Sequence, residues 1–286
     1  MDRRVAAALA IAGALFVPSA VASVMLAHTV FRSAVLPAGA ARELTVTCPR
    51  GYVAASGGVS RAARGVEVLR ARPSGPRAFA FRLGNPVGSS ARRVGVSVAC
   101  WAIRAPAGPD ISLKQIGPRV FSIAPHSQRA TSLACPSDTG PAGAGVDLAP
   151  GAQGQAAGFT GAQLSVRSMT TSLRGFSYVI RNFGANTRTV AVSGNCITVV
   201  SRPGAPRAQL GFKVTTFRSL FRPGRRSTTR ACPLGWRSLA TGYSLPSPSL
   251  SLEGAAAVAG AGRWWVTNAG GAPTRLVLQL VCARLA

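Results

Sequence analysis

The chain has few of the residues from which catalytic sites are built. Its 286 residues include only seven Asp and Glu and two His, against 33 Lys and Arg. Acid–base catalysis needs two such groups held close together, and a nucleophile needs a base that a third group orients. No phosphate-binding glycine motif and no nucleophile elbow occurs where a strand would lead into a helix. The sequence therefore predicts a protein that is not an enzyme, and an extracellular hydrolase using His126 is the weakest of three candidate functions.

Helical periodicity and closely spaced cysteines are also missing. After residue 27 no segment repeats its apolar residues every three or four positions, so we expect an all-β fold. No two cysteines have the Cys-x-x-Cys spacing of a zinc site. We therefore expect neither a metal nor another cofactor.

What the chain does contain is one unit written three times. Each copy opens with Cys-Pro, continues through glycine-rich sequence into an aromatic alternating segment ending in Asn, and closes on a second alternating segment with a cysteine. Six cysteines allow 15 pairings, and the repeat favours pairing within each copy, because each unit then closes on itself in the same way. Each bridge would stabilise its unit by roughly 4 kcal/mol. The expected disulfides are Cys48–Cys100, Cys135–Cys196 and Cys232–Cys282.

The apolar residues inside the units alternate with a period of two, which is typical of half-buried strands. In the first unit Phe79, Phe81 and Leu83 share one parity, and the closing segment alternates in the same way up to Cys100. Asn and Gly between the two segments indicate a turn, so we expect a hairpin there. The opening and closing cysteines would then join either two sheets or two neighbouring strands.

These patterns predict three tandem small antiparallel β-sandwich-like modules, each closed by one disulfide, after an N-terminal signal helix. Stretches rich in Pro and Gly, without apolar periodicity, separate the modules and indicate linkers. The predicted division is module 1 at 23–101, a linker at 102–111, module 2 at 112–198, a linker at 199–209 and module 3 at 210–286.

The N-terminus predicts export. Two arginines precede an uncharged apolar stretch, and the small residues Ala20, Val21 and Ala22 form a cleavage signature. We expect a signal peptide at 1–22, or an uncleaved anchor extending to about residue 27, since the stretch is long enough to span a bilayer. The protein is therefore expected to be secreted or associated with the cell envelope, where disulfides persist.

Positive charge dominates the chain. The formal net charge is +26, and Lys114 and Lys213 are its only lysines, so nearly all the basic residues are arginines. Such a surface attracts polyanions. The leading candidate function is therefore a non-enzymatic protein that adheres to, or associates structurally with, anionic polymers or surfaces of the cell envelope. Nucleic acid is a poorer candidate, because aromatic residues are not interleaved with the arginines. The candidate polyanion-binding residues are Arg218, Arg222, Arg225, Arg226 and Arg230.

The alternative function is an array of carbohydrate-binding, lectin-like modules. Aromatic rings offer flat apolar faces with a polar edge, which suits contact with a sugar ring. In the pair at 264–265 the two indoles have opposite parity, so one of them should point away from the core. The candidate sugar-stacking residues are Trp101, Trp236 and Trp265.

The unit openings also carry a resemblance. Cys-Pro-Arg-Gly at 48–51 and Cys-Pro-Leu-Gly at 232–235 resemble the openings of tandem Cys-Pro-x-Gly…Cys β-repeat secreted proteins of high-GC bacteria, a family of uncharacterised function. The second unit departs from the pattern at 137–140. The resemblance implies an exported β-rich repeat protein and transfers no catalytic or binding residue. The aromatic strand that ends near Asn is also similar to the corresponding strand of six-stranded lectin sandwiches.

Overall fold

The computed structural model describes residues 24–61, 65–104, 110–150, 163–201, 208–258 and 260–286. Within these ranges the chain forms eighteen β-strands and no helix, so the all-β expectation is confirmed. The predicted signal segment at 1–22 lies outside the described residues. None of the described chain forms a helix of the length and apolarity that a membrane span requires.

Each disulfide-closed unit contributes six strands. In the first unit these are β1 (Val24–Leu36), β2 (Ala41–Thr47), β3 (Val53–Arg61), β4 (Glu67–Pro73), β5 (Ala78–Gly84) and β6 (Arg92–Arg104). In the second they are β7 (Asp110–Ile123), β8 (Gln128–Ala134), β9 (Gly140–Asp147), β10 (Leu164–Ser172), β11 (Gly175–Asn182) and β12 (Arg188–Val200). In the third they are β13 (Leu210–Phe221), β14 (Gly224–Ala231), β15 (Arg237–Ser244), β16 (Leu250–Val258), β17 (Ala261–Asn268) and β18 (Thr274–Leu285).

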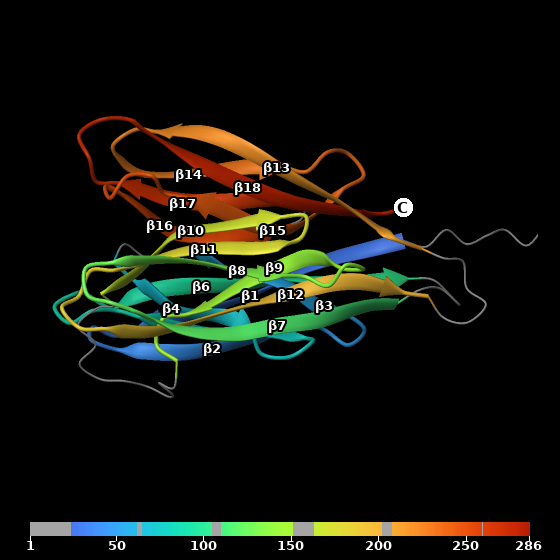
Figure 1. Ribbon diagram of the computed structural model, residues 1–286, viewed down its shortest axis with the longest axis horizontal. Coiled ribbons are helices and arrows are strands. Elements are labelled where there is room, and N and C mark those ends of the chain that lie inside the picture. The colour runs from blue at the N-terminus through green and yellow to red at the C-terminus, as the bar shows by residue number, and fades with distance from the viewer. Residues whose placement is uncertain (1–23, 62–64, 105–109, 151–162, 202–207, 259) are drawn as a thin grey trace, which may run out of the picture.

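The same strand order recurs in every unit. The first, sixth and third strands lie side by side in one sheet, and the second, fifth and fourth strands lie side by side in the other. All of these pairings are antiparallel. The strands of all three units run along the long axis of the molecule, with the third unit above the first two in the view of Figure 1.

The sheets do not stop at the unit boundaries, so the expectation of three sandwich modules is only partly right. β4 pairs with β9 and β10 pairs with β15, which creates two six-stranded sheets that each cross from one unit to the next. Apolar alternation reports which face of a strand is buried, but the hydrogen-bonding edge of a strand has no comparable signal in the sequence. The strands also extend into the range assigned to the first linker, since β6 ends at Arg104 and β7 begins at Asp110.

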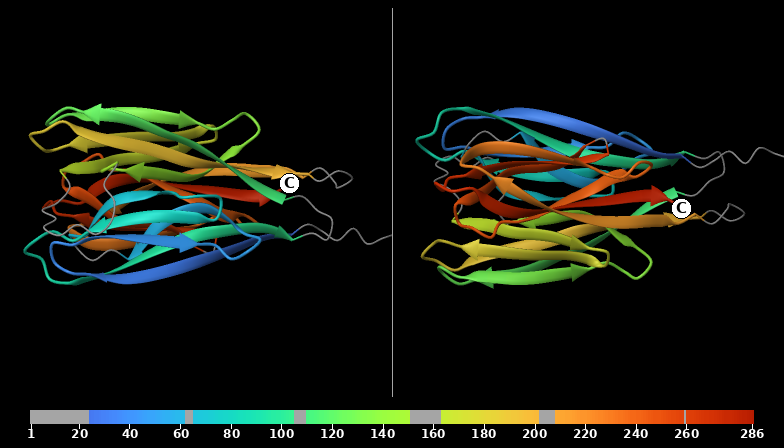
Figure 2. Two further views of the ribbon diagram at one scale, coloured as in Figure 1. Left: turned by 90° about the horizontal axis from the view of Figure 1, so that it is seen from below. Right: turned by 90° about the horizontal axis from the view of Figure 1, so that it is seen from above.

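The third junction is a close approach between β3 and β16, which are end strands of the two three-stranded sheets. A Cβ atom added at Gly58 would clash with the carbonyl oxygen of Ala255, and one added at Gly254 would lie 2.5 Å from the carbonyl oxygen of Val59. Glycine therefore lets the two backbones come together. Each unit contacts both of the others, and the result is a propeller-like ring of three units. In both views of Figure 2 the first unit (blue to cyan) and the second (green to yellow) lie on opposite sides, with the third (orange to red) between them.

The Asn turn joins two sheets, so the expected hairpin is wrong. β5 pairs with β2 and β4, whereas β6 pairs with β1 and β3. Both segments alternate in the same way because each lines the interior of the sandwich from its own side. The Asn side chain fastens this crossing: Nδ2 of the buried Asn85 donates to the carbonyl oxygens of Leu36 and Ser90, at 3.0 Å each. The side chains of Asn182 and Asn268 make the corresponding bonds.

Every sandwich has its own apolar core between its two sheets. Phe79, Phe81 and Leu83 are fully buried in the first, as their alternation predicts. A further cluster lies where the three units meet, and its members come from equivalent positions in the sequence. Ala55, Ala142 and Leu239 each follow the opening cysteine by seven residues, and Trp101, Ile197 and Ala283 each follow the closing cysteine directly.

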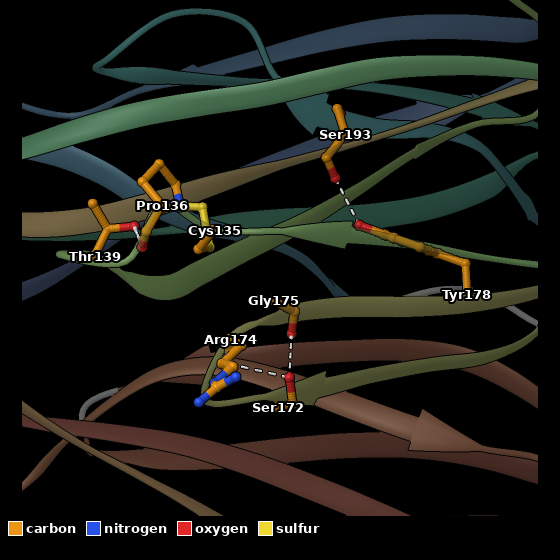
Figure 3. Close-up of a disulfide and its surroundings, with 9 residues drawn as sticks. Cys135, Pro136, Thr139, Ser172, Arg174, Gly175, Tyr178 and Ser193 are labelled. Atoms are coloured by element: carbon orange, nitrogen blue, oxygen red, sulfur yellow. Dashed lines mark hydrogen bonds between the residues drawn. A yellow bond between two sulfur atoms is a disulfide. The ribbon is translucent and has the colours of Figure 1, made fainter.

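The three disulfides join the residues predicted from the repeat, Cys48–Cys100, Cys135–Cys196 and Cys232–Cys282. Each opening cysteine directly follows the second strand of its unit, and each closing cysteine lies in the sixth. The bridge therefore connects the two sheets, which settles the alternative that the sequence left open. Figure 3 shows the surroundings of the second bridge at the Cys-Pro opening.

Candidate anion-binding site

The arginine-rich segment of the third unit lies at the outer edge of the ring. β13 ends one six-stranded sheet and β14 ends one three-stranded sheet, so among the described strands neither has a neighbour on its outer side. The turn between them contains Arg222 and Pro223 and ends at Gly224, whose φ of 94° falls in the left-handed region that glycine tolerates. Edge strands can carry many charges because their side chains remain in water.

Four of the five predicted arginines surround one hollow of about 390 Å³. Arg218 lies on β13, Arg222 in the turn, and two more arginines lie on β14. All four are exposed. Ser219, Ser227 and Thr228 line the same hollow. The lining arginines are Arg218, Arg222, Arg226 and Arg230.

Arg225 does not join this group. Its Nε atom lies 2.5 Å from Oε2 of Glu253 on β16, and Glu253 also accepts a hydrogen bond from the hydroxyl of Thr267 at 2.5 Å. Arg225 is therefore engaged by an acid of another strand and is not among the residues that line the hollow. The expectation that all five arginines act together is therefore wrong for Arg225.

The four remaining arginines keep their positive charge without an acidic partner. In the described part of the chain no carboxylate pairs with any of them. Arg230 instead lies over the ring of Phe217, with Cζ 5.6 Å from the ring centre, which orients its guanidinium without neutralising it. Guanidinium groups are fork-shaped donors suited to phosphate, sulfate and carboxylate oxygens.

Ser219 is the buried polar residue beside this hollow. The residue is 8 % exposed, and its Oγ has no hydrogen-bond partner among the described residues. A buried hydroxyl without a partner costs about 1–3 kcal/mol. Ser219 belongs to the lining of the hollow, but its Oγ is itself covered, so the accessible ligand-binding groups of the hollow are the arginines. The sequence analysis did not identify this serine. The only sign of its burial in the sequence is its position between Arg218 and Leu220, on a strand whose residues alternate between the two faces of the sheet.

The predicted tryptophans do not form a common sugar-binding surface. Trp101 is 1 % exposed at the junction of the three units, so its assignment as a sugar-stacking residue is wrong. Trp236 and Trp265 are half-buried, and Trp264 is buried, as the parity of the pair predicts. Arg284 lies 4.9 Å from the ring centre of Trp236, and Arg263 lies 5.0 Å from that of Trp265, so a guanidinium covers one face of each indole.

His126 lies in an exposed turn between β7 and β8, with a φ of 51°. No acid holds its ring in the described structure, so the residue lacks the orienting partner that a catalytic base needs. The described residues also include no cluster of three or more His, Cys, Asp and Glu that could hold a metal ion.

Comparison with protein-family models and with curated proteins gives no match for this chain. Its function is therefore argued from the geometry alone.

Proposed function

We propose that the protein is a secreted or envelope-associated, non-enzymatic protein that associates with anionic polymers through the arginine hollow of its third unit. The observation that carries the proposal is the group of four exposed arginines around one hollow, none of which pairs with a carboxylate among the described residues. The three disulfides indicate an oxidising, extracellular environment, where acidic polymers are available as ligands. The resemblance to exported β-repeat proteins agrees with this location.

The polymer would be held mainly by electrostatic attraction, so its binding should weaken steeply as salt rises. Each anionic group that an arginine neutralises releases a counterion, and for nucleic acids this lowers the slope of log affinity against log salt by about 0.7–0.9 per contact. Four contacts would therefore give a slope near −3.

The test measures binding of the purified, disulfide-bonded protein to immobilised polyphosphate over a range of salt concentrations. The site variant changes Arg218, Arg222, Arg226 and Arg230 to Gln. The matched control changes four exposed arginines elsewhere to Gln, so that both proteins lose the same charge. The control positions are Arg50, Arg93, Arg174 and Arg237.

We expect the site variant to lose most of its affinity and its salt dependence, while the control keeps both with a small reduction from the lower net charge. Equal losses in the two variants would show that total charge, and not the hollow, attracts the polymer. Absence of binding by the unaltered protein to polyphosphate, and to an acidic polysaccharide tested beside it, would reject the proposed function.

Carbohydrate binding is the alternative, and the half-exposed indoles of Trp236 and Trp265 are what favours it. A sugar that stacks on the open face of either ring should change tryptophan fluorescence, and the change should disappear when that residue becomes Phe. Unchanged spectra with a panel of neutral sugars would remove this alternative without affecting the polyanion proposal.

A further inference from the structure

A cavity of about 500 Å³ lies where the three units meet, away from the arginine hollow on the β13–β14 edge. Its walls come mainly from the third and fourth strands of every unit, namely β3, β4, β9, β10, β15 and β16, with Thr267 of β17 beside them. This volume lies within the range of about 300–1,000 Å³ that is typical of small-molecule sites. The cavity exists only because the units form a ring, so no single unit could provide it.

The fourth strands supply an apolar lining from equivalent positions. Each fourth strand pairs with the fifth strand of its own unit, and the register of this pairing shifts at one point. The paired residue just before the shift is Val68 in β4, Val166 in β10 and Leu252 in β16. All three line the cavity, and Ala71, Met169 and Ala255, three residues further along, do so as well. Apolar walls open to water are unfavourable, at roughly 25 cal/mol per Å². Covering them with an apolar ligand would recover that free energy.

The charge of the lining is opposite to that of the protein. The chain has 33 Lys and Arg, yet none of the described lining residues is basic. Two of its seven acids, Glu67 and Glu253, line the cavity instead. A ligand carboxylate or phosphate buried here would meet carboxylates that already have partners and, among the described lining residues, no basic side chain to pair with, which is costly. A cationic head has no free anion to pair with at Glu253, because Arg225 already neutralises it.

Hydroxyl groups complete the lining. Ser165, Thr241 and Ser251 line the cavity from three different strands, and the acidic side chains add acceptor oxygens. A few polar groups among apolar walls fix the orientation of a bound molecule. An alcohol head can donate to such acceptors and accept from such hydroxyls without carrying charge.

We propose that the cavity at the junction of the three units binds an uncharged amphiphile, an aliphatic chain that ends in a hydroxyl group. The chain would contact the Val68, Val166 and Leu252 positions, and the hydroxyl would bond to the polar side chains of the lining. This site is independent of the arginine hollow, so either can be correct without the other.

The test uses the complete protein and the fluorescent probe N-phenyl-1-naphthylamine, whose emission rises in apolar surroundings. Displacement of the probe is measured with 1-dodecanol, dodecanoate and dodecylammonium, all below their aggregation concentrations. These competitors share one chain and differ in the charge of the head. We expect dodecanol to displace the probe at a concentration at least about tenfold lower than dodecanoate, because the buried carboxylate lacks a cation.

A variant that fills the cavity tests the location. Val68→Trp places an indole on the wall of the cavity, whereas Val87→Trp adds the same group at a position that is 60 % exposed. We expect the first variant to weaken probe binding at least about tenfold and the second to leave it unchanged. If Val68→Trp does not fold, Ala71→Leu fills a smaller part of the same space and should still weaken binding.

Three results would overturn the proposal. One is the absence of probe binding or of displacement by dodecanol. The second is tighter binding of dodecanoate or dodecylammonium than of dodecanol, which would contradict the uncharged head. The third is unaltered binding in a folded cavity-filling variant, which would place the probe elsewhere. None of these results bears on polyphosphate binding at the arginine hollow.

Discussion

Arg70 of the first unit and Asp147 of the second form a buried ion pair across the junction between them, with 2.8 Å from Nε to Oδ2. The two residues are also direct partners where β4 pairs with β9. Nη1 of Arg70 bonds to Glu43 of its own unit at 2.7 Å. Arg70 is 6 % exposed and Asp147 3 % exposed, so this triad fixes the register of the junction inside the protein.

Removing one partner of the pair should destabilise the protein strongly. Asp147→Ala leaves the buried guanidinium with only the more exposed Glu43 as its anion, and breaking a buried pair costs about 3–5 kcal/mol. Glu43→Gln is the matched comparison, because the Glu43 side chain is 40 % exposed and such a pair contributes less than about 1 kcal/mol. Urea unfolding curves measure both changes. Equal, small effects would show that the junction does not depend on this pair.

The glycine at the closest approach of two units should not tolerate a side chain. Gly58, Gly145 and Gly242 each follow the opening cysteine of their unit by ten residues. A Cβ at Gly242 would lie 2.8 Å from the carbonyl oxygen of Met169, on the fourth strand of the preceding unit, and one at Gly58 would clash with the third unit. Overpacking of this kind costs about 1–3 kcal/mol.

Gly58→Ala and Gly242→Ala should therefore lower the unfolding midpoint in urea. Gly271→Ala is the control, because a Cβ there meets nothing within 4 Å. Its effect should stay within about 0.5 kcal/mol. A loss at Gly271 as large as that at Gly58 would mean that the ring contact is not the cause.

The Asn that ends each fifth strand should be needed for the folded state of its unit. Asn182→Ala removes the donor from the carbonyl oxygens of Ile123, Ala124 and Asn186, which the amide holds at 2.8–3.1 Å. Each orphaned carbonyl costs about 1–3 kcal/mol where it is buried, so we expect a loss of about 3 kcal/mol or more in denaturant unfolding. Asn186→Ala changes an exposed side chain and keeps the backbone carbonyl that accepts from Asn182, so it should have little effect on the stability.

The sequence predicts the strands, the disulfides and the buried face of each strand well, because these follow from the local alternation of apolar residues and from the repeat. Trp101 shows where such reasoning stops. It directly follows Cys100, which faces the core of its own sandwich, so alternation places the indole on the outer face of that sheet. The outer face is covered by the other units, and Trp101 is buried there. Contacts between units leave no local pattern from which they could be predicted.

The same limit applies to the candidate site. A cluster of arginines is visible in the sequence, but the sequence does not show which of them an acid of another strand engages. Arg225 bonds to Glu253, 28 residues away in sequence, while Arg226 lines the hollow. The partnerless state of Ser219 depends on the packing around it and has no counterpart in composition.

Two buried tyrosines should make the protein sensitive to alkali. Burial raises the pKa of Tyr178, whose hydroxyl donates to the carbonyl oxygen of Ser193 at 2.7 Å (Figure 3), and burial also raises the pKa of Tyr243, an effect that nearby Arg167 partly offsets. In the unfolded chain a tyrosine ionises near pH 10. Below that pH both states keep the proton, so the stabilisation from these groups is complete. Above it only the unfolded state gains by ionising, and stability falls.

The expected loss is about 1.4 kcal/mol per pH unit for each tyrosine above about pH 10, as long as the folded state keeps both protons. Urea unfolding at a series of alkaline pH values measures the slope, and near-ultraviolet absorbance reports tyrosinate directly. Tyr178→Phe should remove about half of the slope, although it also deletes the bond to Ser193 and lowers stability at neutral pH. Tyrosinate from Tyr178 that forms before the protein unfolds would contradict this account, because ionisation in the folded state would require a hydroxyl accessible to water.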